Sequence, residues 1–380
     1  MSETRRHEFS NEFLETLPYP TPFFIFSRKR IERNLREFQK YFPASSVHYA
    51  LKANSEPEVL QTLSDAGSGF EAASAYELDM LKAIRVPPEK IIYGTAVKPI
   101  AQIKDFFDYG VDRFAFDSFA ELEKIAAMAP GARVYVRVRV DDTGSVFRFS
   151  EKFGAEKEHA AALLERARDM NLRPYGISFH VGSQASDRMA WARALSDLGV
   201  VFEDAQKKGI VLDVVNLGGG YPCNKYLSSD QSFGLEEIAR HTIEQYKKLP
   251  YQPHLILEPG RGMVADAGVL VAGVVARVDR RESTWLFLDA GTYNALFESM
   301  ACQGSTRYAI TSMRASHDAG EKMFALAGPT GDSMDIISRE VLLPTDINVG
   351  DKIIVHDIGA YNVTTSSAFN GFPKPKAHFV

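Results

Sequence analysis

Short apolar runs alternate with amphipathic segments over much of the chain, from about residue 24 to residue 262. The apolar runs are rich in Val, Ile, Phe and Tyr, which is typical of buried strands. The segments between them, such as ERNLREFQKYF, repeat apolar residues at helical spacing. Strands that alternate with helices predict parallel strands joined by crossover helices, an α/β fold.

Eight runs qualify as strands of this region: SVHYALKA, SGFEAAS, KIIYGTA, RFAFDS, RVYVRVRV, YGISFHVG, VVNLGGG and HLILEPG. Eight strand–helix units predict a (β/α)8 TIM barrel over residues 24–262. A doubly wound sheet is the alternative, but it would need fewer strands and a switch point.

The pattern changes after residue 262. The segments GVLVAGVVARVDRR, STWLFLDAG, KMFALAGPTG, EVLLPTDINVGDKIIVHDIGAY and AHFV are Val-rich and broken by turns. They predict an all-β domain, a sandwich or barrel made by residues 1–23 and 263–380. The early run TPFFIFSR is equally apolar, and we expect it to add a strand to this second domain.

Charge and composition narrow the function classes. The 380 residues carry a net charge of -5, and acidic and basic residues are spread along the whole length, so no basic stripe predicts nucleic-acid or membrane binding. The start, MSETRRHEFSNEF, is polar, and no apolar run approaches the roughly 18 residues of a membrane span. Cys223 and Cys302 form neither a disulfide framework nor a metal motif. We therefore expect a cytoplasmic enzyme of small-molecule chemistry without a metal.

Lys52 closes the run SVHYALKA. Catalytic groups of a TIM barrel follow the carboxyl ends of its strands, and an apolar strand end can desolvate an amine and lower its pKa. A neutral amine of this kind can form a Schiff base. A lysine at such a place is equally explained as a surface residue whose ammonium stays in water.

Polar residues and glycines follow the later strands. His180 and Ser183 come after YGISF, and Gly218, Gly219 and Gly220 come after VVN. Consecutive glycines can expose backbone N–H groups that bind a phosphate, and an imidazole can stack on a planar cofactor. A core histidine and a tight turn would explain the same residues.

The run HLIL is followed by Glu258, Gly260 and Arg261, which places a carboxylate beside a guanidinium at the end of the last barrel strand. The carboxylate suits a pyridinium nitrogen, and the guanidinium suits a phosphate. A structural Glu–Arg pair is the alternative. Glu71, after SGF, could be a charge partner of the lysine or a solvated carboxylate.

Taken together and in order, these segments resemble the fold type III pyridoxal-phosphate (PLP) decarboxylases, whose fold is similar to that of alanine racemase. The likeness is to the branch of ornithine decarboxylase, which also holds lysine, arginine and diaminopimelate decarboxylases. It runs nearly end to end and rests on YALKAN, GFEAASAYEL, KFGA, ISFHVGSQ, NLGGGYP, LEPGR, LDAGTYNALFESM, GPTGDSMD and GAYNVTTSSAFNGF.

The resemblance implies a role for each candidate. Lys52 would form the Schiff base with the cofactor, His180 would stack on its ring, and Glu258 would pair with the ring nitrogen. Arg137 and Glu71 would lie close to the Schiff base. The phosphate would be held by Ser183, Gly218, Gly219, Gly220, Gly260, Arg261 and Tyr361.

The resemblance also implies a head-to-tail homodimer with shared active sites, in which Lys152 and Asp335 form an intersubunit ion pair. Asp332 would bind the distal amine of the substrate, and Glu298 is a candidate for the same task, although a solvated carboxylate would explain it equally.

One position departs from the family pattern. The family usually has a cysteine in the GPTCD motif, which helps to protonate Cα after CO2 leaves, and here that position is Gly331. Lys52 or an ordered water would have to deliver the proton, and Gly331 would enlarge the substrate pocket.

The sequence leaves several functions open. The first is decarboxylation of a free basic amino acid such as L-ornithine or L-lysine. The second is decarboxylation of a larger conjugate in siderophore or peptide-antibiotic biosynthesis, which Gly331 would accommodate. A catalytically silent regulatory paralogue and a racemase are the remaining alternatives. A silent paralogue would have lost cofactor residues, and a racemase needs a further base that we cannot identify.

Overall fold

A computed structural model of the chain describes residues 8–223, 233–302, 308–314 and 320–380. The chain divides into two compact units. The barrel unit comprises the described part of residues 32–263, and the sheet unit comprises residues 8–31 with the described part of 264–380. We propose that these units are the two domains that the sequence predicts at residues 24–262 and at 1–23 with 263–380.

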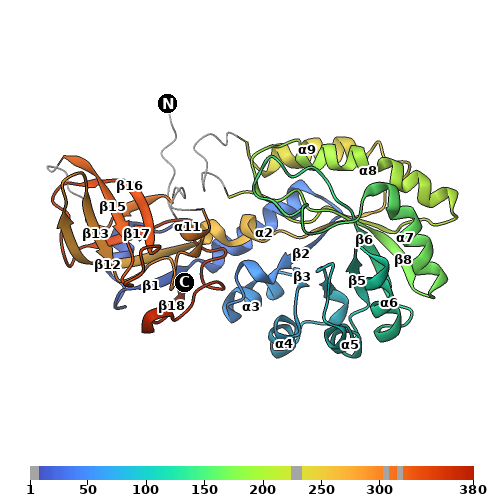
Figure 1. The fold of residues 1–380 in the computed structure, drawn as a ribbon, viewed down its shortest axis with the longest axis horizontal. Coiled ribbons are helices and arrows are strands. Elements are labelled where there is room, and N and C mark those ends of the chain that lie inside the picture. The colour runs from blue at the N-terminus through green and yellow to red at the C-terminus, as the bar shows by residue number, and fades with distance from the viewer. Residues whose placement is uncertain (1–7, 224–232, 303–307, 315–319) are drawn as a thin grey trace. The chain divides into compact units, whose positions relative to one another are not determined.

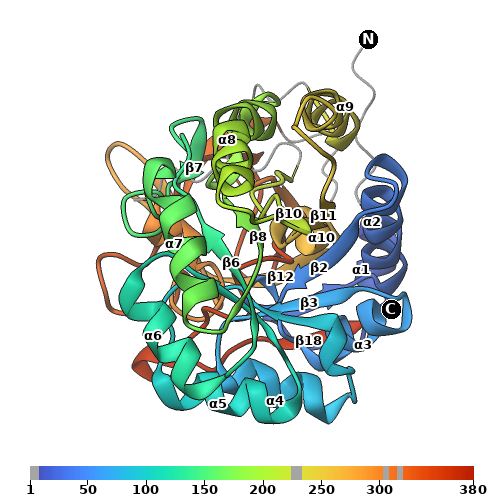
Figure 2. The same ribbon diagram turned by 90° about the vertical axis from the view of Figure 1, so that its right-hand side faces the viewer.

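The barrel unit contains a closed parallel barrel of eight strands in the order β10-β11-β2-β3-β4-β5-β6-β8, all within the described residues (Figure 2). Each strand coincides with one of the predicted runs, so the barrel is confirmed and the doubly wound sheet is wrong. The strands are β2 (Ser46–Ala50), β3 (Gly69–Ala72), β4 (Ile91–Tyr93), β5 (Arg113–Phe116), β6 (Arg133–Arg137), β8 (Arg173–Ser178), β10 (Val214–Asn216) and β11 (His254–Leu257).

Helices cover the outside of the barrel, and Figure 2 shows α4 to α8 arranged around the strands. The helices that connect or flank the strands are α2 (Arg28–Tyr41), α3 (Pro57–Asp65), α4 (Ala75–Ala83), α5 (Ile100–Tyr109), α6 (Phe119–Met128), α7 (Lys157–Asp169), α8 (Ala190–Lys207), α9 (Leu235–Tyr246) and α10 (Arg261–Val264). Strands β3, β4 and β5 are buried at every position, as expected for strands that are covered on both faces.

Local sequence explains how two of these helices begin. Ser74 and Ser118 are the N-caps of α4 and α6, and their hydroxyls accept from the amides of Glu77 and Glu121 at 3.3 Å. Such caps satisfy N–H groups that the first helical turn leaves without a partner. Both caps stand two residues after the last residue of a barrel strand, on the face where catalytic residues of a barrel gather.

Several short elements complete the barrel unit. Strands β7 (Ser145–Phe147) and β9 (Ser183–Ala185) form a two-stranded antiparallel sheet that the sequence does not predict. The short 3-10 helix η1 (Leu51–Ala53) follows β2 and carries Lys52, and η2 (Pro88–Lys90) precedes β4.

The sheet unit is built on an eight-stranded sheet with the path β14-β17-β12-β13-β15-β16, to which β1 and β18 are added (Figure 1). Its strands are β1 (Phe23–Phe26), β12 (Gly268–Asp279), β13 (Thr284–Leu288), β14 (Ile310–Ser312), β15 (Glu321–Ala327), β16 (Ile336–Pro344), β17 (Lys352–Val355) and β18 (Lys376–Phe379). The short helices α1 (Asn11–Glu15) and α11 (Phe297–Ala301), with η3 (Ala265–Ala267) and η4 (Phe369–Gly371), complete the unit.

The run TPFFIFSR supplies β1, as predicted. It pairs antiparallel with β12 and parallel with β18, which joins the two ends of the chain in one sheet. Phe23 and Ile25 pack in a core cluster with Leu14, Val271 and Ile354. Strand β14, in contrast, carries no strong apolar signal, and the sequence does not predict it.

Candidate active site

The carboxyl ends of the barrel strands carry most of the predicted site residues. Lys52 follows β2, Glu71 lies in β3, and Arg137 ends β6. The remaining ones follow β8, β10 and β11: His180, Ser183, Gly218, Gly219, Gly220, Glu258, Gly260 and Arg261. Because all eight strands are parallel in one closed barrel, these ends meet at one face.

Lys52 and Glu71 form an ion pair at this face. The ammonium Nζ of Lys52 lies 2.6 Å from Oε2 of Glu71, and the Glu71 side chain is almost fully buried. The lysine side chain is still 44% exposed, so it can be approached from outside the barrel. An amine beside a buried carboxylate is held in one place, and a proton can pass between the two groups.

Glu258 is a second carboxylate of the site. Its Oε1 accepts from Nδ2 of Asn216 at 2.5 Å, and its amide donates to the carbonyl of Gly218 at 2.8 Å. Burial raises the pKa of Glu258 to about 7; the negative charge of Glu71 also raises it, whereas Lys52 lowers it. A carboxyl that is costly to ionise without a cation nearby is suited to a cationic ring nitrogen.

His180 presents a neutral ring. Its Nδ1 accepts from the amide of Gly182 at 3.0 Å, which leaves the proton on Nε2. Burial, followed by the positive charges of Arg137 and Lys52, lowers the pKa of His180 well below its usual range. The ring of Phe149 meets it edge to face, with 5.0 Å between centroids. The imidazole is therefore a fixed, uncharged planar surface.

Two of the three glycines after β10 adopt a conformation that other residues resist. The φ angles are +63° at Gly218 and +101° at Gly220, in the left-handed region. A Cβ at Gly218 would lie 2.1 Å from the carbonyl oxygen of Phe179, and one at Gly219 would lie 3.0 Å from Nε2 of His180. The amide of Gly218 donates to Asn216, whereas the amides of Gly219 and Gly220 donate to no acceptor among the described residues.

Arg261 and Ser183 lie beside each other in the barrel unit. Nη2 of the buried Arg261 is 3.5 Å from the hydroxyl oxygen of Ser183, and its guanidinium lies 5.7 Å from the ring centroid of Phe147. Arg137 likewise packs over an aromatic ring, 4.9 Å from the centroid of Phe153. A guanidinium, a hydroxyl and two backbone N–H groups together make a donor set for a phosphate.

Two residues of this face escaped the sequence analysis. Asn216 orients Glu258 and Gly218 at once, and its place between an apolar strand and the glycines was the only signal for it. Glu77 accepts from the amide of Ala73 at 2.7 Å. Burial raises the pKa of Glu77 to about 7, and the negative charge of Glu71 adds to this effect.

Four predicted site residues belong to the sheet unit. Glu298, at the start of α11, is only 5% exposed, so the solvated alternative is wrong. Asp332 accepts from the amide of Met334 at 2.7 Å. A Cβ at Gly331 would find its nearest neighbour, Nδ2 of Asn370, 3.9 Å away. Tyr361 has a φ of +57°, which is uncommon for a residue other than glycine.

Asp335 is buried in its own loop. It is 2% exposed, and its carboxylate accepts four hydrogen bonds, from the amides and hydroxyls of Thr292 and Thr330, at 2.7–3.0 Å. The exposed Lys152, its expected partner across a dimer, lies over the ring of Phe153. The ion pair between Asp335 and Lys152 of a second subunit stays a prediction.

Within the described parts of the chain, no helix is long and apolar enough to cross a membrane. No group of three or more His, Cys, Asp or Glu side chains in the described residues is placed to hold a metal ion.

Comparison with known proteins identifies the family. Residues 28–265 match the family described as pyridoxal-dependent decarboxylase, pyridoxal binding domain. Lysine/ornithine decarboxylase of Selenomonas ruminantium is 34% identical and covers 93% of this chain and 88% of its own. Antizyme inhibitor 2 of Xenopus laevis is 33% identical, covering 94% and 80%. The solved lysine/ornithine decarboxylase of Vibrio vulnificus with putrescine has a TM-score of 0.88 at 30% identity, covering 97% and 98%.

The barrel face fits the cofactor of this family. Pyridoxal phosphate carries an aldehyde, a ring nitrogen and a phosphate, and so needs an amine, a carboxylate and a set of anion donors. Lys52, Glu258 and the donor set at Gly219, Gly220 and Arg261 are of these kinds and follow strands of one barrel. A Cβ at Gly219 would lie 2.7 Å from the carbonyl oxygen of Glu258 and 3.0 Å from Nε2 of His180, so only glycine lets the backbone lie this close to both residues. The chain belongs to the pyridoxal-dependent decarboxylases.

Proposed function

We propose that this enzyme removes the α-carboxylate of a free basic amino acid, L-ornithine or L-lysine, and releases the diamine. The observation that carries the proposal is the pairing of Lys52 with Glu71 at a barrel face that also holds the buried Glu258. The similar enzymes from Selenomonas ruminantium and Vibrio vulnificus, whose names specify lysine and ornithine, support this substrate class over a larger conjugate.

The proposed roles follow from the local chemistry. Lys52 would bind the cofactor covalently, and Glu71 would hold the lysine nitrogen in place. Glu258 would pair with the ring nitrogen, because a cation beside this buried carboxyl removes the cost of its ionisation. His180 would support the ring face as a neutral plane. Bound in this way, pyridoxal phosphate supplies an electron sink that weakens the bonds at the substrate's Cα.

Backbone and side-chain donors would hold the phosphate. The amides of Gly219 and Gly220 have no acceptor among the described residues, and Arg261 lies beside the Ser183 hydroxyl. We assign Gly218 and Gly260 to the shape of this cradle and Tyr361 to the phosphate itself. Arg137 is proposed near the bond between Lys52 and the cofactor, since its charge acts on both His180 and Glu258.

The substrate end is proposed in the sheet unit. Asp332 would bind the distal ammonium, with Glu298 as a second carboxylate and Gly331 as open space for the side chain. Since no cysteine stands at position 331, we propose that Lys52 or a water molecule returns the proton to Cα. Protonation by Lys52 is reasonable because Glu71 keeps the lysine nitrogen at a fixed place.

Two further proposals concern the protein as a whole. We propose a homodimer with shared active sites, in which Asp332 of one subunit completes the site of the other. We also propose a cytoplasmic location, which is supported by the low cysteine content of the chain, only Cys223 and Cys302 in 380 residues.

The experiment is CO2 release by purified, PLP-loaded protein with L-ornithine, L-lysine, L-arginine and meso-diaminopimelate, while the cofactor's absorption band is recorded. Fast release with ornithine or lysine is expected, and Lys52→Ala should lose both band and turnover. A band without turnover on any free amino acid would favour the conjugate substrate. A wild-type protein without a band would favour the silent paralogue, which the similarity to antizyme inhibitor 2 makes worth testing.

A further inference from the structure

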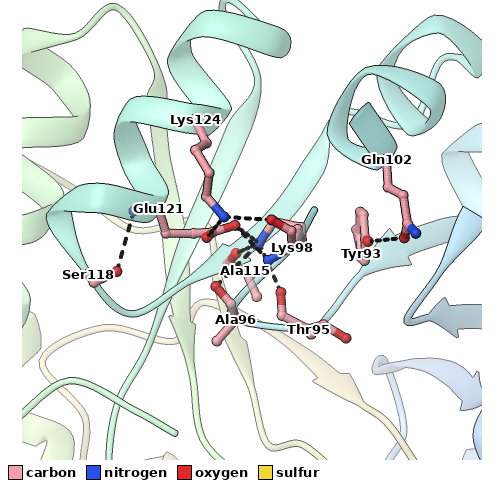
Figure 3. A network of polar contacts seen from close by, with 9 residues as sticks. All are labelled: Tyr93, Thr95, Ala96, Lys98, Gln102, Ala115, Ser118, Glu121 and Lys124. Carbon is pink, nitrogen blue, oxygen red and sulfur yellow. Dashed lines mark hydrogen bonds and ion pairs between the residues drawn. The ribbon is translucent and has the colours of Figure 1, made fainter. Parts of the chain in front are cut away.

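A fully buried lysine lies at the carboxyl end of the barrel, outside the residues assigned above. Lys98 stands between β4 and α5, and its side chain has no exposed surface. Its ammonium donates to the carbonyls of Thr95 at 2.9 Å and Ala115 at 2.5 Å and lies 2.9 Å from Oε1 of Glu121 (Figure 3). A longer contact, 3.5 Å, joins the ammonium to the carbonyl of Ala96, so its three protons face four acceptors.

Glu121 is the centre of this network. Its Oε1 also accepts from the amide of Lys98 at 3.1 Å, and its Oε2 lies 2.5 Å from Nζ of Lys124 (Figure 3). Lys124 in turn donates to the carbonyl of Lys98 at 2.5 Å. The segment that follows β4 is thus tied to α6 through its backbone and its side chain. Burying two charges is costly, so a buried pair that is merely structural would be replaceable by apolar residues.

The network lies where the barrel is joined most weakly by its backbone. Strands β4 and β5 are paired at a single position, Tyr93 with Phe114, whereas every other neighbouring pair of described barrel strands has two or more paired positions. We call the boundary between these two strands the β4–β5 seam. The ammonium of Lys98 donates across it to the carbonyl of Ala115 in β5. At the opposite end of the same seam, Arg113 of β5 donates to the carbonyls of Glu89 and Ile91. One buried cation therefore joins the two strands at each end.

The segment held by Lys98 borders the active site. It begins with Gly94, directly after β4, and a Cβ at Gly94 would lie 2.7 Å from Cγ and 2.8 Å from Oε1 of Glu71. The Glu71 carboxylate therefore packs directly against the backbone of Gly94. The other oxygen of Glu71 holds Lys52 at 2.6 Å. A shift of this segment moves the backbone of Gly94, and the Glu71 carboxylate then loses its fixed distance to Lys52.

We propose that Lys98 and Glu121 are positioning residues of the decarboxylase, which close the β4–β5 seam and thereby keep Glu71 against Lys52. They touch neither substrate nor cofactor and act through Gly94 and Glu71. The inference rests on the proposed role of Lys52.

The test is Lys98→Met, which keeps the length of the side chain and leaves Glu121 paired with Lys124. Three quantities are measured: amide hydrogen exchange of residues 94–99 in the apo-protein, the dissociation constant of PLP, and the pH midpoint of the bound cofactor's absorption band. We expect faster exchange and an affinity weakened by about tenfold or more, which corresponds to about 1.4 kcal/mol. The band midpoint should fall by about half a unit, because a protonated nitrogen on Lys52 loses its fixed carboxylate.

Two controls separate positioning from general loss of stability. Arg113→Lys weakens the other end of the same seam, away from Glu71, and should lower the melting temperature without moving the PLP affinity or the band midpoint. Lys104→Met removes the exposed pair of Lys104 with Asp108 in α5 and should change none of the three quantities.

The outcomes are distinct. A folded Lys98→Met with wild-type PLP affinity and band midpoint would overturn the inference, as would equal changes in Arg113→Lys. If Lys98→Met does not fold, Glu121→Gln decides, because it keeps the size of the side chain and the local hydrogen bonds but removes the charge; it must shift the same three quantities in the same direction. A wild-type protein that shows no band would overturn the proposed function itself, whereas a normal wild-type band with unchanged variants would overturn this inference alone.

Discussion

Replacing Gly218 by alanine should damage the barrel face more than any other single methyl group. The φ of +63° costs a residue with a Cβ about 1–2 kcal/mol. The new Cβ would lie 2.1 Å from the carbonyl oxygen of Phe179, so the ends of β8 and β10 must move apart, which costs about 1–3 kcal/mol. The free energy of unfolding should therefore fall by about 2–5 kcal/mol, a large part of the about 5–15 kcal/mol that stabilises a domain.

The same movement should weaken the binding of PLP. Gly218 accepts from the amide of Glu258 and donates to Asn216, which in turn binds the Glu258 carboxylate. A displaced Gly218 therefore shifts Glu258 and the amides of Gly219 and Gly220, which donate to no acceptor in the described parts of the chain. Each lost hydrogen bond to a charged group is worth about 1.5–3 kcal/mol, so the affinity for PLP should fall by about tenfold or more.

The assays are thermal unfolding of the apo-protein and titration with PLP followed by absorbance. The melting temperature should drop by roughly 5–15 °C. Gly331→Ala is the matched control, since its Cβ meets nothing closer than 3.9 Å, and its stability should stay within about 0.5 kcal/mol of the wild type. A Gly218→Ala protein as stable and as tight for PLP as Gly331→Ala would refute the reasoning from backbone crowding.

Three other predictions follow from the site. Because burial raises the pKa of Glu258 to about 7, the native apo-protein holds an extra proton between the carboxyl's ordinary pKa of about 4.3 and pH 7, so its stability should fall as pH rises through this window. Glu258→Gln should make that fall smaller in denaturant titrations at several pH values, and an unchanged slope would show that Glu258 is ionised in the apo-protein. Gly331→Cys should fold normally and keep kcat within a few-fold, whereas a tenfold rise in kcat would show that no other group replaces the cysteine as proton donor. Asp332→Asn should raise KM for L-ornithine or L-lysine by about tenfold or more with a smaller effect on kcat; the exposed Ser333→Ala is its control, and an unchanged KM would remove Asp332 from the substrate site.

Much of the barrel could be predicted from the chain alone. All eight strands stand out as apolar runs because a parallel strand that is covered on both faces must be apolar throughout. Most of these strands are followed within a few residues by a polar residue or a glycine, and closure of the barrel brings these residues to one face. Lys52, His180, Gly218 and Glu258 are therefore recognisable before any coordinates. The departure at Gly331 is also visible in the sequence, as is the strand in TPFFIFSR.

Other features depend on distances across the barrel, which no local pattern encodes. The sequence offers Glu71 as a charge partner of Lys52 or as a solvated carboxylate, and only the packing of separate strands decides for the ion pair. That Asn216 orients Glu258, and that Glu298 and Asp335 are buried, also follow only from how separate strands and loops pack. Strands β7, β9 and β14 are too short to show a period, so pairing rather than propensity creates them.

The amino-acid sequence by itself determined which segments become strands, where polar chemistry follows them, and which family the pattern resembles, because burial and turn geometry act on neighbouring residues. Only the tertiary structure decided which charged groups share a site and how much free energy their ionisation costs there. The pKa values of Glu258 and Glu77 depend on burial and on charges from other strands. The position of Lys98, beside the two barrel strands that are paired at a single position, depends on how the strands pack. Electrostatic interactions act through space rather than along the chain, and so they exist only once the barrel has closed.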